Sequence, residues 1–322
     1  MKIELVVQNN KTGTIYDVSE LVSNISWETE ITEQPGKLTF DFVSDGKANF
    51  NEGSPVYLKV DGQGIFYGWV FTKKYSKDEI IQVTAYDQIR YLKNVDTYVL
   101  PSMTSSEIFI KICKDFQLKY KVVDGSEYKL PPSVNDAKTL GSIIQSALDA
   151  TLSSFGKWFI VYDEFGTLVH RDIVNLKTNL VFGDESELTD YDYQTSIDDS
   201  YNQIKLVRDN KDTKKREVYL VKDSNNIQSW GLLQYYEKVD ENMNAAQIMA
   251  RADNLLKLHN SVTRSLSLEC LGNFKVRAGS GIYLSIKNLG GVAVNQYAMV
   301  KKCTHKIKND LHTMDLKVEL VI

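Results

Sequence analysis

The sequence contains the stretch GSPVYLKV at residues 53–60 and a closely similar stretch, GSGIYLSI, at residues 279–286. The identical positions are Gly53, Ser54, Tyr57 and Leu58 in the first copy and Gly279, Ser280, Tyr283 and Leu284 in the second. Apolar and polar residues alternate in both copies, which is typical of a β-strand with one buried face and one solvent-facing face. The repeat therefore indicates two related strands that lie far apart in the chain.

The similarity extends to the segments on both sides of the repeated strand. Each copy is followed by a glycine-containing turn and by an apolar run that ends in two lysines, at residues 69–74 and 297–302. The copies are separated by 226 residues at the glycines (279 − 53) and by 228 at the first of these lysines (301 − 73), which predicts a two-residue loop insertion. Alternating strands precede the copies at 38–42 and 266–270 and follow them at 81–85 and 314–320. Five elements in the same order predict two homologous antiparallel β units.

The remaining sequence predicts helices and hairpins between the two β units. Residues 98–180 form a small α/β domain, with a capping box at Thr104 and Glu107, a second helix at 137–153 and a hairpin around 163–168. Asn244 and Gln247 cap a third helix at 245–259. The predicted fold class is mainly β with α/β insertions, divided into a first β unit at 1–97, the α/β domain at 98–180, a discontinuous second β unit at 181–222 and 261–322, and a helical insertion at 223–260.

Length and composition limit the classes of protein to be considered. A chain of 322 residues with 43% hydrophobic and 25% charged residues is an ordinary globular protein of two or three domains. Its apolar runs fall short of the roughly 20 residues that span a bilayer, so we expect no membrane insertion. The net charge of −4, without a clustered basic run, predicts no tight binding of nucleic acid. The cysteines, expected to be buried free thiols of a reducing cytoplasm, are Cys113, Cys270 and Cys303.

Candidate catalytic and metal-binding residues are few and badly spaced. The four histidines share no ligand spacing with one another or with a cysteine, so we expect no metal and no cofactor. His305 and His312 flank a predicted hairpin tip, where we expect them to be exposed. The acidic tract at 184–199 does not fit an EF-hand loop. Asp87 fits the N-cap of a short helix better than a catalytic acid. The sequence therefore predicts a protein that is not an enzyme.

In the order of its segments, the chain resembles the baseplate hub proteins of contractile phage tails and tail-like bacteriocins. It is similar to the XkdQ-type hub of PBSX-like prophages, which is related to the late control protein D family. Each motif is weak by itself, but their order covers nearly the whole chain. The segments that carry the resemblance are 53–56, 66–70, 86–92, 163–168, 196–204, 229–231, 245–258 and 279–280.

The resemblance implies two tail-tube-like antiparallel β-barrels in one chain and a homotrimer whose six barrels adapt a sixfold tail tube to a threefold spike. The implied partners are the tail spike, the tail tube or tape-measure protein and other baseplate proteins, in a phage or phage-like particle assembled in the host cytoplasm. We expect the strands at 53–60 and 279–286 to be unpaired barrel edges that join subunits. The alternative functions are a carbohydrate-binding β module of a tail and, third, a tail-associated hydrolase.

Overall fold

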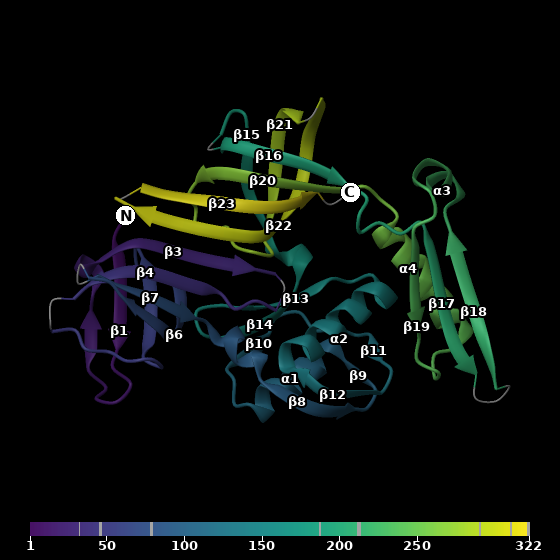
Figure 1. Cartoon of the computed structure of the whole chain (residues 1–322), viewed down its shortest axis with the longest axis horizontal. Helices are drawn as coiled ribbons and strands as arrows, with labels where there is room; N and C mark the ends of the chain where they lie inside the picture. The colour runs from purple at the N-terminus through teal and green to yellow at the C-terminus, as the bar shows by residue number, and fades with distance from the viewer. Residues whose placement is uncertain are drawn as a thin grey trace.

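The computed structural model describes residues 1–31, 33–44, 47–77, 80–186, 188–210, 214–289, 291–309 and 311–320. These residues form two β units, an α/β domain and a smaller domain at one end of the molecule (Figure 1). We call the last of these, residues 201–260, the distal domain.

The N-terminal β unit contains seven strands whose inward side chains form one core. Alternation in β3, β4 and β5 places every second residue inside, so that Trp27, Leu38, Phe40 and Leu58 are buried together. Its strands are β1 (Ile3–Gln8), β2 (Ile15–Asp17), β3 (Val22–Glu30), β4 (Lys37–Val43), β5 (Pro55–Val60), β6 (Gln63–Tyr75) and β7 (Ile80–Tyr86).

The C-terminal β unit has a separate core, built mainly from strands that follow the distal domain. Leu266, Leu268, Leu284 and Leu316 are buried in it, together with Cys270. Its strands are β15 (Lys177–Gly183), β16 (Leu188–Ser196), β20 (Thr263–Leu271), β21 (Gly281–Leu289), β22 (Val292–Lys308) and β23 (Leu311–Leu320).

The two β units share one strand order. In the N-terminal unit the neighbours run β3-β4-β7-β6-β5-β1, and in the C-terminal unit they run β16-β20-β23-β22-β21-β15. The units differ at the last position, where β1 is antiparallel to β5 but β15 is parallel to β21. The repeated strands β5 and β21 therefore occupy equivalent places in two equivalent sheets.

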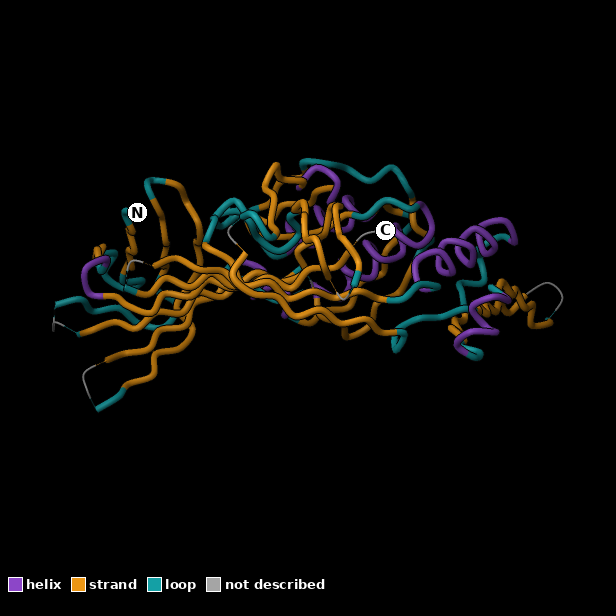
Figure 2. The backbone as a smooth tube through the Cα atoms, turned by 90° about the horizontal axis from the view of Figure 1, so that it is seen from above, coloured by secondary structure: helices purple, strands orange, loops and turns teal. Residues whose placement is uncertain are grey.

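The prediction of two separate barrels is not supported, because the strands of both units belong to one 13-stranded sheet. Strand β22 is 17 residues long, whereas its neighbour β21 has 9. Past the end of β21, β22 pairs with β3 over six residue pairs, from Ile307 opposite Ile25 to Lys302 opposite Glu30. Figure 2 shows the strands as a long curved layer. Among the described residues the path of strands runs from β16 to β2 and does not close.

The α/β domain packs two helices against short strands, as the sequence predicts. Helix α1 (Ser105–Asp115) begins with the predicted capping box of Thr104 and Glu107. Helix α2 (Leu140–Phe155) begins later than predicted, because Thr139 is its N-cap and Ala137, with a φ of 49°, lies at an irregularity of the preceding strand. Its strands are β8 (Val95–Leu100), β9 (Met103–Thr104), β10 (Tyr120–Val122), β11 (Lys129–Leu130), β12 (Ser133–Thr139), β13 (Phe159–Asp163) and β14 (Leu168–Asp172). The 3-10 helices are η1 (Ser19–Leu21) in the N-terminal unit, η2 (Gln88–Lys93) directly after β7, and η3 (Ile173–Leu176) directly after β14.

The distal domain corrects the predicted boundaries of the second β unit. The strands at 203–210 and 215–222 were expected to belong to that unit, but they form a separate three-stranded sheet with a strand at 234–238, in the order β18-β17-β19. Its inner face packs on α4, with Ile204, Leu206 and Ile248 in the core. The pairing of β17 with β19 is parallel and crosses over through α3, so short-range alternation does not reveal it. The elements are β17 (Gln203–Asn210), β18 (Lys215–Lys222), α3 (Ser224–Trp230), β19 (Gln234–Lys238) and α4 (Ala245–His259).

Candidate functional site

The glycine that opens each repeated strand adopts a conformation that other residues avoid. The φ angle is 82° at Gly53 and 91° at Gly279. The two glycine N–H groups donate to equivalent carbonyls, Val70 O at 2.7 Å and Val300 O at 2.8 Å. A left-handed turn of this kind costs a residue with a side chain roughly 1–2 kcal/mol, which explains why glycine stands at both positions.

The serine that follows makes the same contacts in both copies. Its hydroxyl accepts a backbone N–H at 3.1 Å, from Asn51 to Ser54 and from Arg277 to Ser280. Both serines are buried, which leaves these bonds to satisfy the hydroxyls.

The bonds from the glycine N–H groups to Val70 and Val300 correct the predicted alignment of the segments that follow the repeated strand. Equating Val70 with Val300 gives an offset of 230 residues (300 − 70) instead of 228, so the second copy is longer by four residues. The lysine pair at 73–74 is therefore not equivalent to the pair at 301–302. Three of the four extra residues lie in β21, which has 9 residues where β5 has 6, and the fourth lies in β22 before Val300.

The tyrosine and the leucine of each copy point to opposite faces of the sheet. Leu58 and Leu284 are fully buried in the two cores. Tyr57 lies on the outer face opposite Tyr67, and Tyr283 lies opposite Tyr297. All eight predicted positions thus occupy equivalent places in the two sheets, but they lie in two places in the molecule and do not converge on one site.

The expectation that β5 and β21 are free edges is wrong. Strand β5 is hydrogen-bonded to β1 on one side and to β6 on the other. Strand β21 is likewise paired with both β15 and β22. Because their backbone groups are already used, these strands cannot join subunits by adding another strand.

The α/β domain contacts the outer face of the N-terminal unit through the tip of its β13–β14 hairpin. The ring of Phe165 lies 6.4 Å from Tyr57 and 5.9 Å from Tyr67, measured between centroids. Glycines make this approach possible, since a Cβ on Gly64 would lie 2.7 Å from Phe165 and a Cβ on Gly166 would lie 2.7 Å from Tyr67. The hairpin tip is therefore docked tightly on the outer face of the sheet.

The same hairpin also reaches the C-terminal unit. A Cβ on Gly279 would lie 2.5 Å from the Cδ1 atom of Ile160 on β13, so the repeated glycine is also a packing position. Arg277 donates to the carbonyl of Asp163 at 2.8 Å and lies 4.3 Å above the ring of Tyr162. The β13–β14 hairpin of the α/β domain therefore contacts both β units.

Two buried carboxyl groups lie at this three-way junction. Asp87 caps η2, as predicted, by accepting from Ile89 N at 3.0 Å, and it also accepts from Gly36 N at 2.9 Å. Burial raises the pKa of Asp87, and the charge of Asp163 raises it further. Burial likewise raises the pKa of Asp163 to about 6. Both carboxyls are buried and bind backbone groups at this junction.

His305 and His312 are not exposed, contrary to prediction. His305 on β22 is 1% exposed and lies in the seam between the units, stacked on Trp27 of β3 at 5.1 Å. The sequence did not reveal this environment because β3, from the other unit, covers the hairpin. Phe274 stacks on both imidazoles, at 5.1 Å from His305 and 4.0 Å from His312.

The hydrogen bonds of this histidine pair define its tautomers. His305 Nε2–H donates to Val276 O at 2.9 Å, so its Nδ1 accepts from His312 Nε2–H at 3.0 Å. Burial lowers the pKa of both imidazoles to about 4. The thiol of Cys303 lies 3.1 Å from His305 Nε2, and burial raises its pKa, so it stays protonated. Across the described residues no three His, Cys, Asp or Glu groups are arranged as metal ligands.

Two open grooves lie on either side of the loop after β3. One, of about 490 Å³, includes Glu28 and Lys37, which form an ion pair of 3.2 Å, and Arg90, stacked on Phe71 at 5.2 Å. The other, of about 520 Å³, includes Glu33, Asp149 and Trp158. Most of the charged groups in the first groove have partners within the chain, and neither groove brings a nucleophile beside a base, as acyl transfer would require.

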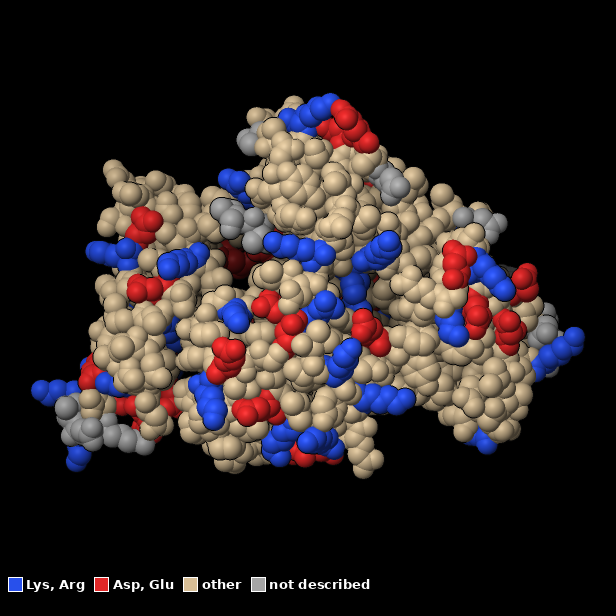
Figure 3. Space-filling view, turned by 180° about the vertical axis from the view of Figure 1, so that it is seen from behind, with Lys and Arg blue, Asp and Glu red and all other residues tan. Residues whose placement is uncertain are grey.

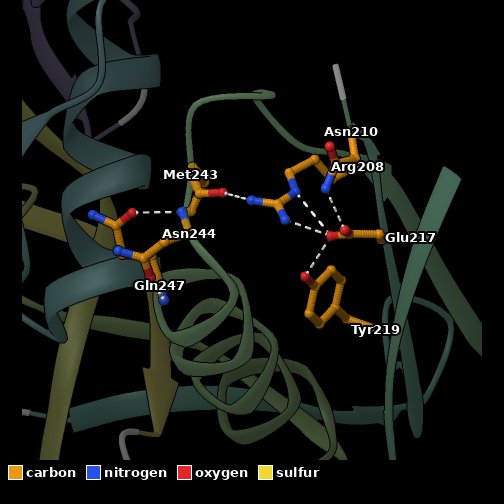
Figure 4. A network of polar contacts seen from close by, with 7 residues as sticks. All are labelled: Arg208, Asn210, Glu217, Tyr219, Met243, Asn244 and Gln247. Atoms are coloured by element: carbon orange, nitrogen blue, oxygen red, sulfur yellow. Dashed lines mark hydrogen bonds and ion pairs between the residues drawn. The ribbon is translucent and has the colours of Figure 1, made fainter. Parts of the chain in front are cut away.

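A polar network fixes the distal sheet to the segment before α4 (Figure 4). The carboxylate of Glu217 accepts from Asn210 at 2.6 Å, from the Tyr219 hydroxyl at 2.8 Å and from Arg208. These bonds lower the pKa of Glu217 to about 2, and the bond from Asn210 makes the largest contribution. Arg208 also donates to the carbonyl of Met243, directly before the α4 capping box. The network connects β17 and β18 to the start of the helix.

Charges of both signs are mixed on one face of the molecule. On the face drawn in Figure 3, Lys and Arg side chains alternate with Asp and Glu, and the described residues form no continuous basic patch there. The helices that the structure describes are all too short or too polar to cross a bilayer.

Comparison with known proteins agrees with this architecture. A family model described as YqbQ-like matches residues 25–319. The uncharacterized protein YqbQ of Bacillus subtilis is 31% identical over 93% of this chain and 92% of its own length, and the phage-like element PBSX protein XkdQ of the same species is 31% identical over 91% and 87%. The 43 kDa tail protein of prophage MuSo2 from Shewanella oneidensis has the same fold, with a TM-score of 0.72, 12% identity and 98% coverage of both chains. The chain belongs to the YqbQ-like family and is a homologue of XkdQ.

Proposed function

We propose that this protein is the baseplate hub of a contractile phage tail or tail-like particle, adapting a sixfold tail tube to a threefold spike. The observation that carries the proposal is the internal duplication. Two β units with one strand order, the same glycine turn and the same serine hydrogen bonds lie in a single chain and are fused through β3 and β22. A duplication of this kind doubles the number of similar units that a ring presents to its neighbours.

Symmetry explains why such a duplication is useful. Three copies of a chain with two similar units present six similar surfaces, while the chain itself repeats three times. One side of the ring can then match six tube subunits and the other a trimeric spike. Two names support a place in a tail: that of the relative XkdQ, a protein of the phage-like element PBSX, and that of the prophage tail protein with the same fold.

The partners follow from that position. We infer a homotrimer that contacts the tail spike, the tail tube or tape-measure protein and other baseplate proteins, in a particle assembled in the host cytoplasm. The net charge of −4 and the alternation of charges favour a channel wall along which DNA passes without binding.

We infer that the role is structural and not enzymatic. The carboxyl groups with raised pKa at the junction are buried, and two outer aromatic rings of the N-terminal unit, Tyr57 and Tyr67, contact the chain's own Phe165. A ring already covered by the chain offers little stacking surface to a sugar, which weighs against the carbohydrate-binding alternative.

Cryo-electron microscopy of the intact particle tests the proposal. We expect three copies around the tail axis, between the last tube ring and the spike, with the N- and C-terminal units alternating around the channel. Six copies in the ring, or a position on the outer rim of the baseplate, would refute it.

A further inference from the structure

Several strands keep one free edge in the described part of the chain, and the two longest of them are β16 and β18. Strand β16 has 9 residues and pairs only with β20, and β18 has 8 residues and pairs only with β17. The free edge of a strand presents N–H and C=O groups that pair readily with another strand. Figure 1 shows β18 at the far end of the distal domain, away from β16, so the two edges do not meet within one chain.

The surface beside β16 is acidic and carries an internal repulsion. Asp190 lies directly opposite Glu269 on β20, and Asp192 is the next outward residue of β16. All three side chains are exposed, and among the described residues no ion pair includes them. Glu269 lies in turn opposite Asp315, whose carboxylate is paired with Lys306. Like charges directly opposite on neighbouring strands are destabilising, so a cation from outside the chain would relieve a cost that the free chain carries.

The outer face of the distal sheet has the complementary charge. Lys205, Lys222, Lys238 and Arg216 lie on the face away from α4, and the single carboxylate on that face, Asp209, is already bound by Arg216 and Lys238. Lys205 and Lys222 make no ion pair within the described residues. This basic face belongs to a chain whose net charge is −4.

Apolar side chains lie among these lysines. Val218 is 55% exposed, Leu220 46% and Tyr236 52%. Leu220, Lys205 and Tyr236 form one row across the three strands. A face of apolar groups surrounded by charges has the composition of a protein interface, with a hydrophobic centre and a polar rim.

We propose that β18 and the outer face of the distal sheet bind the β16 edge of a second copy of this chain. The occupant follows from the similar lengths of the two edges and from the opposite charges of their side chains. The contact joins two different surfaces, so repeating it builds a closed ring when the rotation between copies permits. Only the closure at three copies rests on the proposed hub function; the contact itself does not.

Charge reversal tests the contact in the full-length protein. Lys205→Glu/Lys222→Glu and Asp190→Lys/Asp192→Lys should each weaken self-association about tenfold or more at low salt, because like charges then meet. Mixing the two variants should restore association, and 0.5 M salt should reduce the difference. The matched control, Lys11→Glu/Lys275→Glu, changes the same charge at exposed sites elsewhere and should associate like the unmodified protein. Sedimentation velocity over a concentration series measures all four.

Cross-linking in assembled particles decides the matter if the isolated chain stays monomeric. A chain with Lys222→Cys and Asp192→Cys should give dimers and trimers with a short bismaleimide, whereas Lys222→Cys with Lys11→Cys should not. A threefold ring without these cross-links would overturn the inference and leave the hub function standing. Cross-links in a particle with six copies would sustain the contact and refute the threefold hub. Equal association of every reversed variant would also overturn the inference.

Discussion

Two features require glycine at position 279. Its φ of 91° disfavours residues with a side chain, and Ile160 fills the space where a Cβ would lie. Gly62 also has a positive φ, of 81°, but no atom lies within 4 Å of where its Cβ would be, so only the backbone conformation requires glycine there. We expect Gly62→Ala to cost about 1–2 kcal/mol of unfolding free energy and Gly279→Ala clearly more. Urea denaturation of both variants measures the difference. Equal losses would show that the contact with Ile160 is easily relaxed.

The buried histidine pair makes stability depend on pH in a defined direction. The pKa of His305 and of His312 is about 4 in the folded chain, against 6.5 for a free imidazole. Between these values the unfolded chain takes up protons that the folded chain refuses, so this contribution to stability is lost as the pH falls from about 6.5 to about 4. We expect each imidazole to account for up to about 3 kcal/mol over that range.

Titration by NMR checks the assignment directly. The C2 protons of both imidazoles should shift with midpoints well below 6, and the folded protein should lose stability between pH 7 and pH 5. Midpoints near 6.5 would mean that the seam between β3 and β22 is open to water.

Asp163 acts in the opposite direction. Its pKa is raised to about 6, so its contribution is present at low pH and is lost as the pH rises through 6, when the buried carboxyl must ionise. In the unmodified protein Gly166 N donates to Asp163 Oδ1 at 2.7 Å, and the side-chain oxygen of an asparagine can accept the same bond. Asp163→Asn should therefore match the unmodified protein at pH 5 and exceed it by about 1–3 kcal/mol at pH 8. If Asp163→Asn instead lowers the free energy of unfolding equally at both pH values, the carboxylate is ionised in the folded chain and stabilises it by pairing with Arg277.

Among the elements, the β13–β14 hairpin connects the α/β domain to the N-terminal unit through one ring. Phe165 is 37% exposed, so only part of its burial energy is at stake. We expect Phe165→Ala to cost about 1–2 kcal/mol and to speed amide exchange in residues 160–170. Val99→Ala, at a side chain that is 72% exposed in the same domain, is the control and should change neither. Unaltered exchange after Phe165→Ala would mean that the other contacts of the hairpin, among them those with Arg277 and Tyr67, suffice to hold it.

Local signals in the sequence predicted elements better than they predicted contacts. The caps at Thr104, Asn244 and Asp87 were identified correctly because each depends on residues two or three positions away. The repeated strands were identified because alternation and glycine are also local. The parallel pairing of β17 with β19 and the joining of β3 to β22 depend on segments far apart in the chain, and no short pattern encodes them. The burial of His305 was missed for the same reason, since Trp27 provides it.

At the scale of the whole molecule, the duplication predicts how the protein associates. We expect the isolated chain to be monomeric at low concentration, because contacts to spike and tube complete the hub. Addition of the spike protein should give a complex with three copies of the chain. Light scattering coupled to size exclusion measures the mass in both cases. A stable hexamer of the isolated chain would contradict the symmetry argument, because twelve β units would then face the tube.

The long strand β22 has a mechanical consequence. One half of it is an inner strand of the C-terminal unit, and the other half is bonded to β3 of the N-terminal unit. A pull along the strand direction loads all six residue pairs of that second half at once, in shear, so they must fail together. A sideways force would instead open them one after another. The molecule should therefore resist stretching along β22 far better than peeling, which gives a tail component that transmits force a preferred axis.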